Sequence, residues 1–155
     1  MLDLKINEKV AVIIVLYNPD TNDIDNVRRI AQYNVGFVVD NSLIPFMDGE
    51  TIGNMSYICN KANIGIAKAQ NIALREILKG DYEYVVFLDQ DTRVVVDYPS
   101  QIAMEFSRID NGRLAVLGPQ VVNAVTGGQY ASAIHKYEIS ENGFSLRKHI
   151  ISSGS

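Results

Sequence analysis

The chain has 155 residues, of which 47% are hydrophobic and 21% charged, and its net charge is −4 at pH 7. These values suit one soluble globular domain with a hydrophobic core and exclude a disordered chain, while the acidic balance argues against binding to a nucleic-acid backbone. With Cys59 as the single cysteine, and no apolar run near the roughly 20 residues of a membrane helix, we expect a cytoplasmic protein without disulfides.

The first forty residues predict a strand, a helix and a second strand. Val10–Leu16 is a continuous, largely β-branched run, which is typical of a strand buried on both faces of a parallel sheet. Asp20 or Thr21 can cap a following helix. The inward face of that helix is expected to consist of Ile24, Val27, Ile30 and Ala31. The second strand is expected over Val35–Val39, and the polar residues Asp40–Ser42 end it.

Another strand, helix and strand are predicted in the middle of the chain. Met55–Cys59 is the third predicted strand, and the next helix is expected to begin between Ile64 and Ile66. Its inward residues, at helical spacing, are Ile66, Ala69, Ala73 and Ile77. Gly80 is expected to stop this helix, because glycine tolerates the left-handed conformation common after a helix. Tyr84–Leu88 is the fourth predicted strand.

The remaining predicted elements are a helix over Pro99–Ile109 and two short strands, Leu114–Leu117 and Val121–Val122. Strands and helices that alternate in this way predict an α/β fold with a doubly wound, mostly parallel sheet flanked by helices. We expect residues 1–155 to form one domain of this kind.

Polar residues follow three of the predicted strands without an intervening spacer. These sets are Tyr17-Asn18, Asp40-Asn41-Ser42 and Asp89-Gln90-Asp91. Ligands of open parallel α/β sheets bind at the carboxyl ends of the strands. If the strands are neighbours, the three sets converge on one binding site.

Asp89 and Asp91 predict a metal site. Residues two apart in an extended strand point to the same side, so the two carboxylates are expected to lie close together and repel each other. Mg²⁺ or Mn²⁺ would remove this repulsion and could also bind a diphosphate. The alternative is a solvated turn, because aspartate is common where strands end.

Two further segments could contact a nucleoside. A carboxylate only accepts hydrogen bonds, so Asp40 suits the N3–H of uracil or thymine, which cytosine lacks. Alternatively, Asp40 forms an Asx turn with Asn41 and Ser42. Asn63 can cap the next helix, and Gly65 lets the backbone approach a ligand closely.

In their order along the chain, these motifs resemble glycosyltransferase family 2. The motifs are Tyr17-Asn18-Pro19, Val38-Val39-Asp40-Asn41-Ser42, Asn60-x-x-Asn63-x-Gly65-x-Ala67-x-Ala69-x-Asn71 and Val86-Phe87-Leu88-Asp89-Gln90-Asp91-Thr92. The Asp-Gln-Asp form, the Asp-Asn-Ser form and the final Ile151–Ser155 are most similar to the bacterial rhamnosyltransferase branch of that family. The resemblance covers nearly the whole chain.

The resemblance implies a Rossmann-like GT-A fold and an inverting transfer of a sugar from a nucleotide diphosphate. In the rhamnosyltransferase branch, this means rhamnose from dTDP-rhamnose, passed to a cell-surface polysaccharide or a lipid-linked glycan. Such an acceptor can bring the protein to the inner face of the membrane. The nucleotide-binding residues implied are Tyr17, Asn18, Asp40, Asn63, Gly65 and Asp89. Asp91 is implied to hold the metal ion, Mg²⁺ or Mn²⁺, with Asp89 beside it.

The end of the chain departs from the family pattern. Family members continue through a region that binds the acceptor and supplies a carboxylate general base for its hydroxyl group. Here no acidic motif of that kind follows Asp110, since Glu138 and Glu141 lie in a plain polar stretch. We therefore expect the general base and the acceptor-binding region beyond residue 155, and a chain that binds the donor without transferring its sugar.

Other functions fit parts of the pattern. A phosphatase of the haloacid dehalogenase class also has Asp-x-Asp after a strand, but after its first strand, and with Thr or Val where this chain has Arg93. A non-catalytic nucleotide-binding module on the same fold is the second alternative. A dinucleotide-binding dehydrogenase is disfavoured, because no Gly-x-Gly-x-x-Gly follows the first strand.

Overall fold

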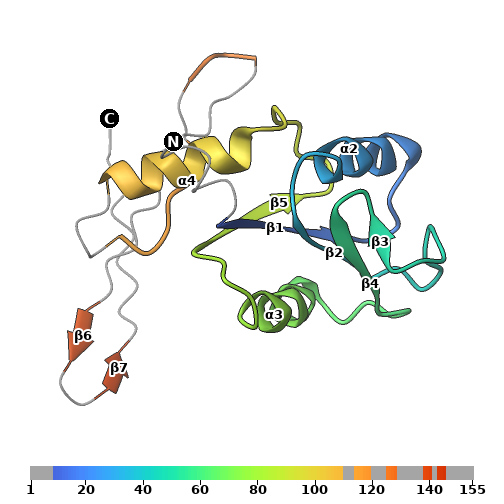
Figure 1. Cartoon of the computed structure of the whole chain (residues 1–155), viewed down its shortest axis with the longest axis horizontal. Coiled ribbons are helices and arrows are strands. Elements are labelled where there is room, and N and C mark those ends of the chain that lie inside the picture. Colours follow the sequence, from blue (N-terminus) through green and yellow to red (C-terminus); the bar gives the residue numbers. More distant parts are fainter. Residues whose placement is uncertain (1–8, 110–113, 120–124, 129–137, 141–142, 146–155) are drawn as a thin grey trace. The chain divides into compact units, whose positions relative to one another are not determined.

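The computed structural model describes residues 9–109, 114–119, 125–128, 138–140 and 143–145. The chain divides into two compact units, Met1–Ala115 and Val116–Ser155. In the second unit, β6 (Glu138–Ser140) and β7 (Gly143–Ser145) form an antiparallel pair. The first unit holds a five-stranded sheet with helices (Figure 1). Its strands are β1 (Val10–Leu16), β2 (Gly36–Asp40), β3 (Thr51–Ile52), β4 (Met55–Cys59) and β5 (Tyr84–Asp89). Its helices are α2 (Thr21–Ala31), α3 (Ile66–Ile77) and α4 (Tyr98–Ile109).

The sheet is mostly parallel, as the sequence predicted. Its strand order is β3-β4-β2-β1-β5, and only β3 runs antiparallel to its neighbour. β1 lies between β2 and β5, with Leu16 opposite Asp40 on β2 and Val15 opposite Asp89 on β5. The ends of these three strands therefore lie at the same edge of the sheet.

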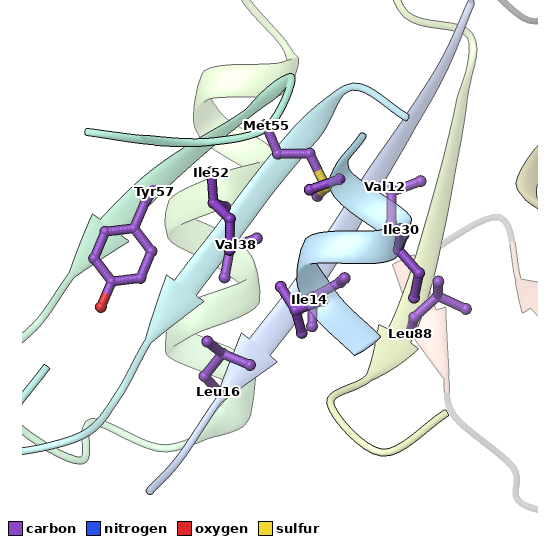
Figure 2. Packing of buried hydrophobic residues seen from close by; sticks show 11 residues of the cluster. Val12, Ile14, Leu16, Ile30, Val38, Ile52, Met55, Tyr57 and Leu88 are labelled. Atoms are coloured by element: carbon purple, nitrogen blue, oxygen red, sulfur yellow. The ribbon is translucent and has the colours of Figure 1, made fainter. Parts of the chain in front are cut away.

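Alternation along β1 divides the core of the first unit into two layers. Val12, Ile14 and Leu16 pack with α2, as Figure 2 shows for the side chains around Ile30. Ala11 and Ile13, on the other face, pack with α3. Because successive strand residues point to opposite faces, a strand apolar at every position can bury both sides. Figure 1 shows α2 and α3 on the two faces, so the doubly wound prediction is confirmed.

The helix ends agree with the sequence prediction in one case and differ in another. Asp20 caps α2, and its side chain accepts a hydrogen bond from the Asp23 N–H (2.9 Å). Asn63 does not cap α3, because Gly65 occupies the N-cap position and the Asn63 side chain accepts from the Gly65 N–H before the helix begins (3.0 Å). Ile66, the first residue of α3, was predicted to face inward but is 54% exposed, whereas Ala69, Ala73 and Ile77 are buried as predicted.

Other boundaries also differ from the prediction. β3 was not predicted, since two residues show no alternation. The predicted strand Leu114–Leu117 is wrong: these residues are irregular, and a strand needs a hydrogen-bonded neighbour, which the described residues do not provide. The predicted strand Val121–Val122 lies outside the described residues. No helix in the described part of the chain is long and apolar enough to cross a membrane.

Gly36 on β2 lies against the backbone of Val12 on β1, and it gives the first testable prediction. Its φ is +138°, and a Cβ atom there would lie 2.0 Å from the Val12 carbonyl oxygen. Gly36→Ala should lower the free energy of unfolding by about 3 kcal/mol or more, through backbone strain and overpacking. Gly49→Ala is the matched control, because the new methyl would meet only the flexible end of Met47. Urea denaturation of both variants checks this, and equal losses would contradict it.

Candidate functional site

The three polar sets predicted at the strand ends do meet in the structure. The Asn41 N–H donates to the Leu16 carbonyl (2.8 Å), which ties the ends of β2 and β1 together. The Asn18 N–H donates to Ser42 Oγ (2.8 Å) across the same two strands. On the other side of β1, the Tyr17 N–H donates to Gln90 Oε1 (2.8 Å). The predicted convergence of these residues is confirmed.

The chain reverses direction across the sheet at this edge. From β1 it passes through α2 to β2 and then on to β4, and from β4 it returns through α3 to β5 on the opposite side of β1. The connections that follow β1 and β4 therefore run over opposite faces, as Figure 1 shows. In open α/β sheets such a reversal of strand order leaves room for a ligand at the carboxyl ends of the two neighbouring strands between which it falls, here β1 and β5. Tyr17 follows β1 directly, and Asp89 is the last residue of β5.

Asp40 is buried and has hydrogen-bond partners for both carboxylate oxygens. Its Oδ1 accepts from the Ser42 N–H (2.8 Å), and its Oδ2 accepts from the Tyr57 hydroxyl (2.5 Å). The side chain is 0% exposed. The alternative weighed from the sequence, an Asx turn through Ser42, is therefore present. A base contact to Asp40 stays a prediction, and it requires that Tyr57 or Ser42 open a path to the carboxylate.

The loop after β4 is joined to the same edge by Asn60, the first residue of the motif that also contains Asn63 and Gly65. The Asn60 N–H donates to the Asp40 carbonyl (2.9 Å), and its side-chain amide donates to Asn41 Oδ1 (2.8 Å). Asn63 and Gly65 follow on this loop and are exposed. Gly65 has φ +85° and no atom within 4 Å of where a Cβ would stand. The loop thus offers open backbone beside the strand ends.

The acidic motif differs from the predicted geometry. β5 ends at Asp89, and the Thr92 N–H donates to the Asp89 carbonyl (3.0 Å), so residues 89–92 form a turn. The premise that an extended backbone directs both carboxylates to one side is therefore wrong. Asp89 and Asp91 are both exposed, and their carboxylates make no hydrogen bond or ion pair with other residues that the structure describes.

The donor chemistry of this turn fits a hard cation with ligands of its own. Within the described ranges, no group of three or more His, Cys, Asp or Glu side chains comes together as a complete metal site. Mg²⁺ and Mn²⁺ are hard ions that one or two carboxylates commonly bind together with phosphates and water. Asp89 and Asp91 supply carboxylate oxygens of this kind, so a metal here would arrive with a phosphate ligand.

Gln90 joins the acidic turn to two other elements. Besides accepting from the Tyr17 N–H, its side chain donates to Asp23 Oδ2 in the first turn of α2 (2.9 Å). The backbone carbonyl of Gln90 accepts from the side chain of Asn26 (3.1 Å). Asp89 and Asp91 therefore flank a residue that is fixed on three sides. No local sequence pattern indicates these contacts, because the partners lie more than 60 positions apart.

The Tyr57–Asp40 hydrogen bond predicts a pH-dependent stability. Burial, and then this hydrogen bond, raise the pKa of Tyr57 above its ordinary value of 10.0. A raised pKa means that the neutral phenol stabilises the fold fully below about pH 10. That contribution is lost by about 1.4 kcal/mol per pH unit as the pH rises toward the folded-state pKa.

Tyr57→Phe should therefore lower the free energy of unfolding by about 2 kcal/mol at pH 7, because Asp40 Oδ2 loses its buried donor. The difference from the unmodified protein should shrink above pH 10. Urea denaturation at pH 7, 9, 10.5 and 11 measures it, with Tyr33→Phe as the control on a 65% exposed tyrosine. A difference that stays constant to pH 11 would contradict the assigned pKa shift.

Comparison with known proteins adds one similarity. The chain is 26% identical over 148 residues to dTDP-rhamnosyl transferase RfbF of Shigella flexneri, an alignment covering 93% of this chain and 48% of that protein. The chain thus spans about half the length of this curated relative. No family model and no solved structure matches the chain. The similarity supports a relationship to glycosyltransferases, on an α/β fold that is Rossmann-like in its sheet and helices.

Proposed function

We propose that this chain is the nucleotide-sugar-binding part of a glycosyltransferase with a GT-A fold. The observation that carries the proposal is the meeting of the ends of β1, β2 and β5 at one edge of the sheet, where the exposed Asp89 ends β5 and the exposed Asp91 follows it. The similarity to a rhamnosyl transferase over 93% of the chain supports it. We propose dTDP-rhamnose as the donor, and a cell-surface polysaccharide or lipid-linked glycan as the acceptor of an inverting transfer.

The nucleotide is proposed to lie along this edge of the sheet. Tyr17, which is 51% exposed directly after β1, and Asn18 would flank it. Asn63 and Gly65 would lie against the nucleoside, where the open backbone at Gly65 allows a ligand to approach closely. Asp89 would accept a hydrogen bond from the 3′-hydroxyl of the deoxyribose, since a carboxylate is an acceptor only.

The diphosphate is proposed to reach Asp91 through a divalent cation. Asp91, with Asp89 beside it, would hold Mg²⁺ or Mn²⁺ in the turn after β5. When bound, such an ion stabilises the negative charge that develops on a departing diphosphate. The two carboxylates would hold the ion at the carboxyl ends of β1 and β5, where the strand order reverses. An inverting transfer also needs a general base on the far side of the sugar, and we assign that role to no residue of this chain.

The metal assignment predicts a specific loss in one variant. Asp91→Asn should weaken the binding of dTDP in the presence of Mn²⁺ about tenfold or more, since it removes a charged ligand of the ion. Binding without metal should be unchanged. Titration calorimetry with and without Mn²⁺ measures both affinities. Asp25→Asn, which removes the same charge from a 66% exposed position of α2, is the control. Unchanged Mn²⁺-dependent binding in Asp91→Asn would contradict the assignment.

The assignment of Asp40 to the base predicts a preference among nucleotides. A hydrogen bond from N3–H to a carboxylate is worth about 1.5–3 kcal/mol, so dUDP should bind roughly tenfold or more tightly than dCDP. These two nucleotides share the deoxyribose and the diphosphate, so the comparison isolates the base. dTDP should behave like dUDP. Equal affinities for dUDP and dCDP at the same Mn²⁺ concentration would remove Asp40 from the base site.

A further inference from the structure

Polar side chains from α2 and the residues after it hold the segment that follows the acidic turn. They donate to alternate backbone carbonyls of this segment, each at 2.7–3.1 Å. The donor and acceptor pairs are Asn26 to Gln90 and Thr92, Arg29 to Val94, and Asn34 to Val96. These four side-chain hydrogen bonds tie residues 90–96 to α2 and to Asn34, although the segment is not itself a strand.

Asn26 has a special position among these donors. Its side-chain NH₂ group donates to the carbonyls of both Gln90 (3.1 Å) and Thr92 (2.9 Å), which are the residues on either side of Asp91. Its amide oxygen accepts from Arg29 Nη2 (3.0 Å). Because a guanidinium group only donates, this contact directs the NH₂ group of Asn26 toward the two carbonyls. Asn26 is 2% exposed, so its hydrogen bonds are shielded from water.

The backbone around Asp91 is therefore fixed without any contact to the Asp91 side chain. The Thr92 N–H closes the turn on the Asp89 carbonyl, and Asn26 holds the carbonyls of Gln90 and Thr92, the residues before and after Asp91. The carboxylates of Asp89 and Asp91 make no contact with other described residues that could orient them. Their geometry thus depends on the backbone, and the backbone depends on Asn26.

We infer that Asn26 is a positioning residue for the cation held by Asp91, an inference that rests on the proposed function. Asn26 acts through the carbonyls of Gln90 and Thr92 and does not touch the ion or the nucleotide. Residues that orient metal ligands commonly change metal affinity about 10- to 100-fold when they are replaced. Loss of the Asn26 donor should therefore weaken Mn²⁺-dependent binding, while nucleotide binding without metal stays the same.

The test compares Asn26→Asp with Asn34→Asp. Both substitutions keep the shape of the side chain and replace an NH₂ donor to two carbonyls by an oxygen; those of Asn34 are Ile30 and Val96. Both should lower stability, but only Asn26→Asp disturbs the residues that flank Asp91. We measure the affinity for dTDP with and without Mn²⁺, and the amide hydrogen exchange of Thr92 without ligand. Asn26→Ala repeats the test without a new charge, should Asn26→Asp fail to fold.

The expected result is an about tenfold or greater loss of the Mn²⁺-dependent gain in affinity for Asn26→Asp, with none for Asn34→Asp. Exchange at Thr92 should be faster in the Asn26 variants alone. If the unmodified chain binds dTDP more tightly with Mn²⁺, and Asn26→Asp and Asn34→Asp both keep that gain, the inference is overturned and the proposed function stands. If the unmodified chain gains no affinity from Mn²⁺, the proposed metal site is overturned, and the inference with it.

Discussion

β1 is hydrogen-bonded to β2 on one side and to β5 on the other, and its side chains are buried on both faces. Its parallel neighbours end beside it, with Asp40 opposite Leu16 and Asp89 opposite Val15. A central strand without polar side chains of its own thereby brings the polar ends of three strands to one edge. The close approach of β2, which needs glycine at Gly36, belongs to the same constraint. Changes that move β1 should therefore disturb the polar residues at this edge directly.

Much of the fold could be predicted from the sequence because its signals are local. A continuous apolar run such as Val10–Leu16 has few alternatives to a strand buried on both faces, and Asp20 carries the capping chemistry of α2 in its own side chain. Prediction failed where structure depends on distant partners. Leu114–Leu117 has the composition of a strand, but a strand exists only beside another one. Asn63 has the chemistry of a helix cap, yet it lies two residues before the cap position.

The candidate site, like the fold, could be predicted from the sequence only in part. The rule that ligands bind at strand ends identified the residues that meet, and the hydrogen bonds between those residues confirm that they do. The burial of Asp40 could not be predicted, because it depends on Tyr57, a strand residue 17 positions away. Nor could the role of Asn26, whose partners lie 64 and 66 positions along the chain. The sequence around an asparagine in an amphipathic helix does not indicate which backbone carbonyls its side chain will contact.

The polar residues of this edge form an inner and an outer layer with different physical roles. Asp40, Asn26 and Asn41 are buried, and no buried side-chain nitrogen or oxygen in the described part of the chain lacks a hydrogen-bond partner. A buried polar group without a partner costs about 1–3 kcal/mol, so each of these bonds strongly disfavours other arrangements of the loops. Tyr17 and Asp91 are exposed and have no such restraint on their side chains. The inner layer therefore fixes the backbone from which the outer side chains project. A ligand that engages the outer layer would have to order only side chains, since the loops that carry them are already ordered.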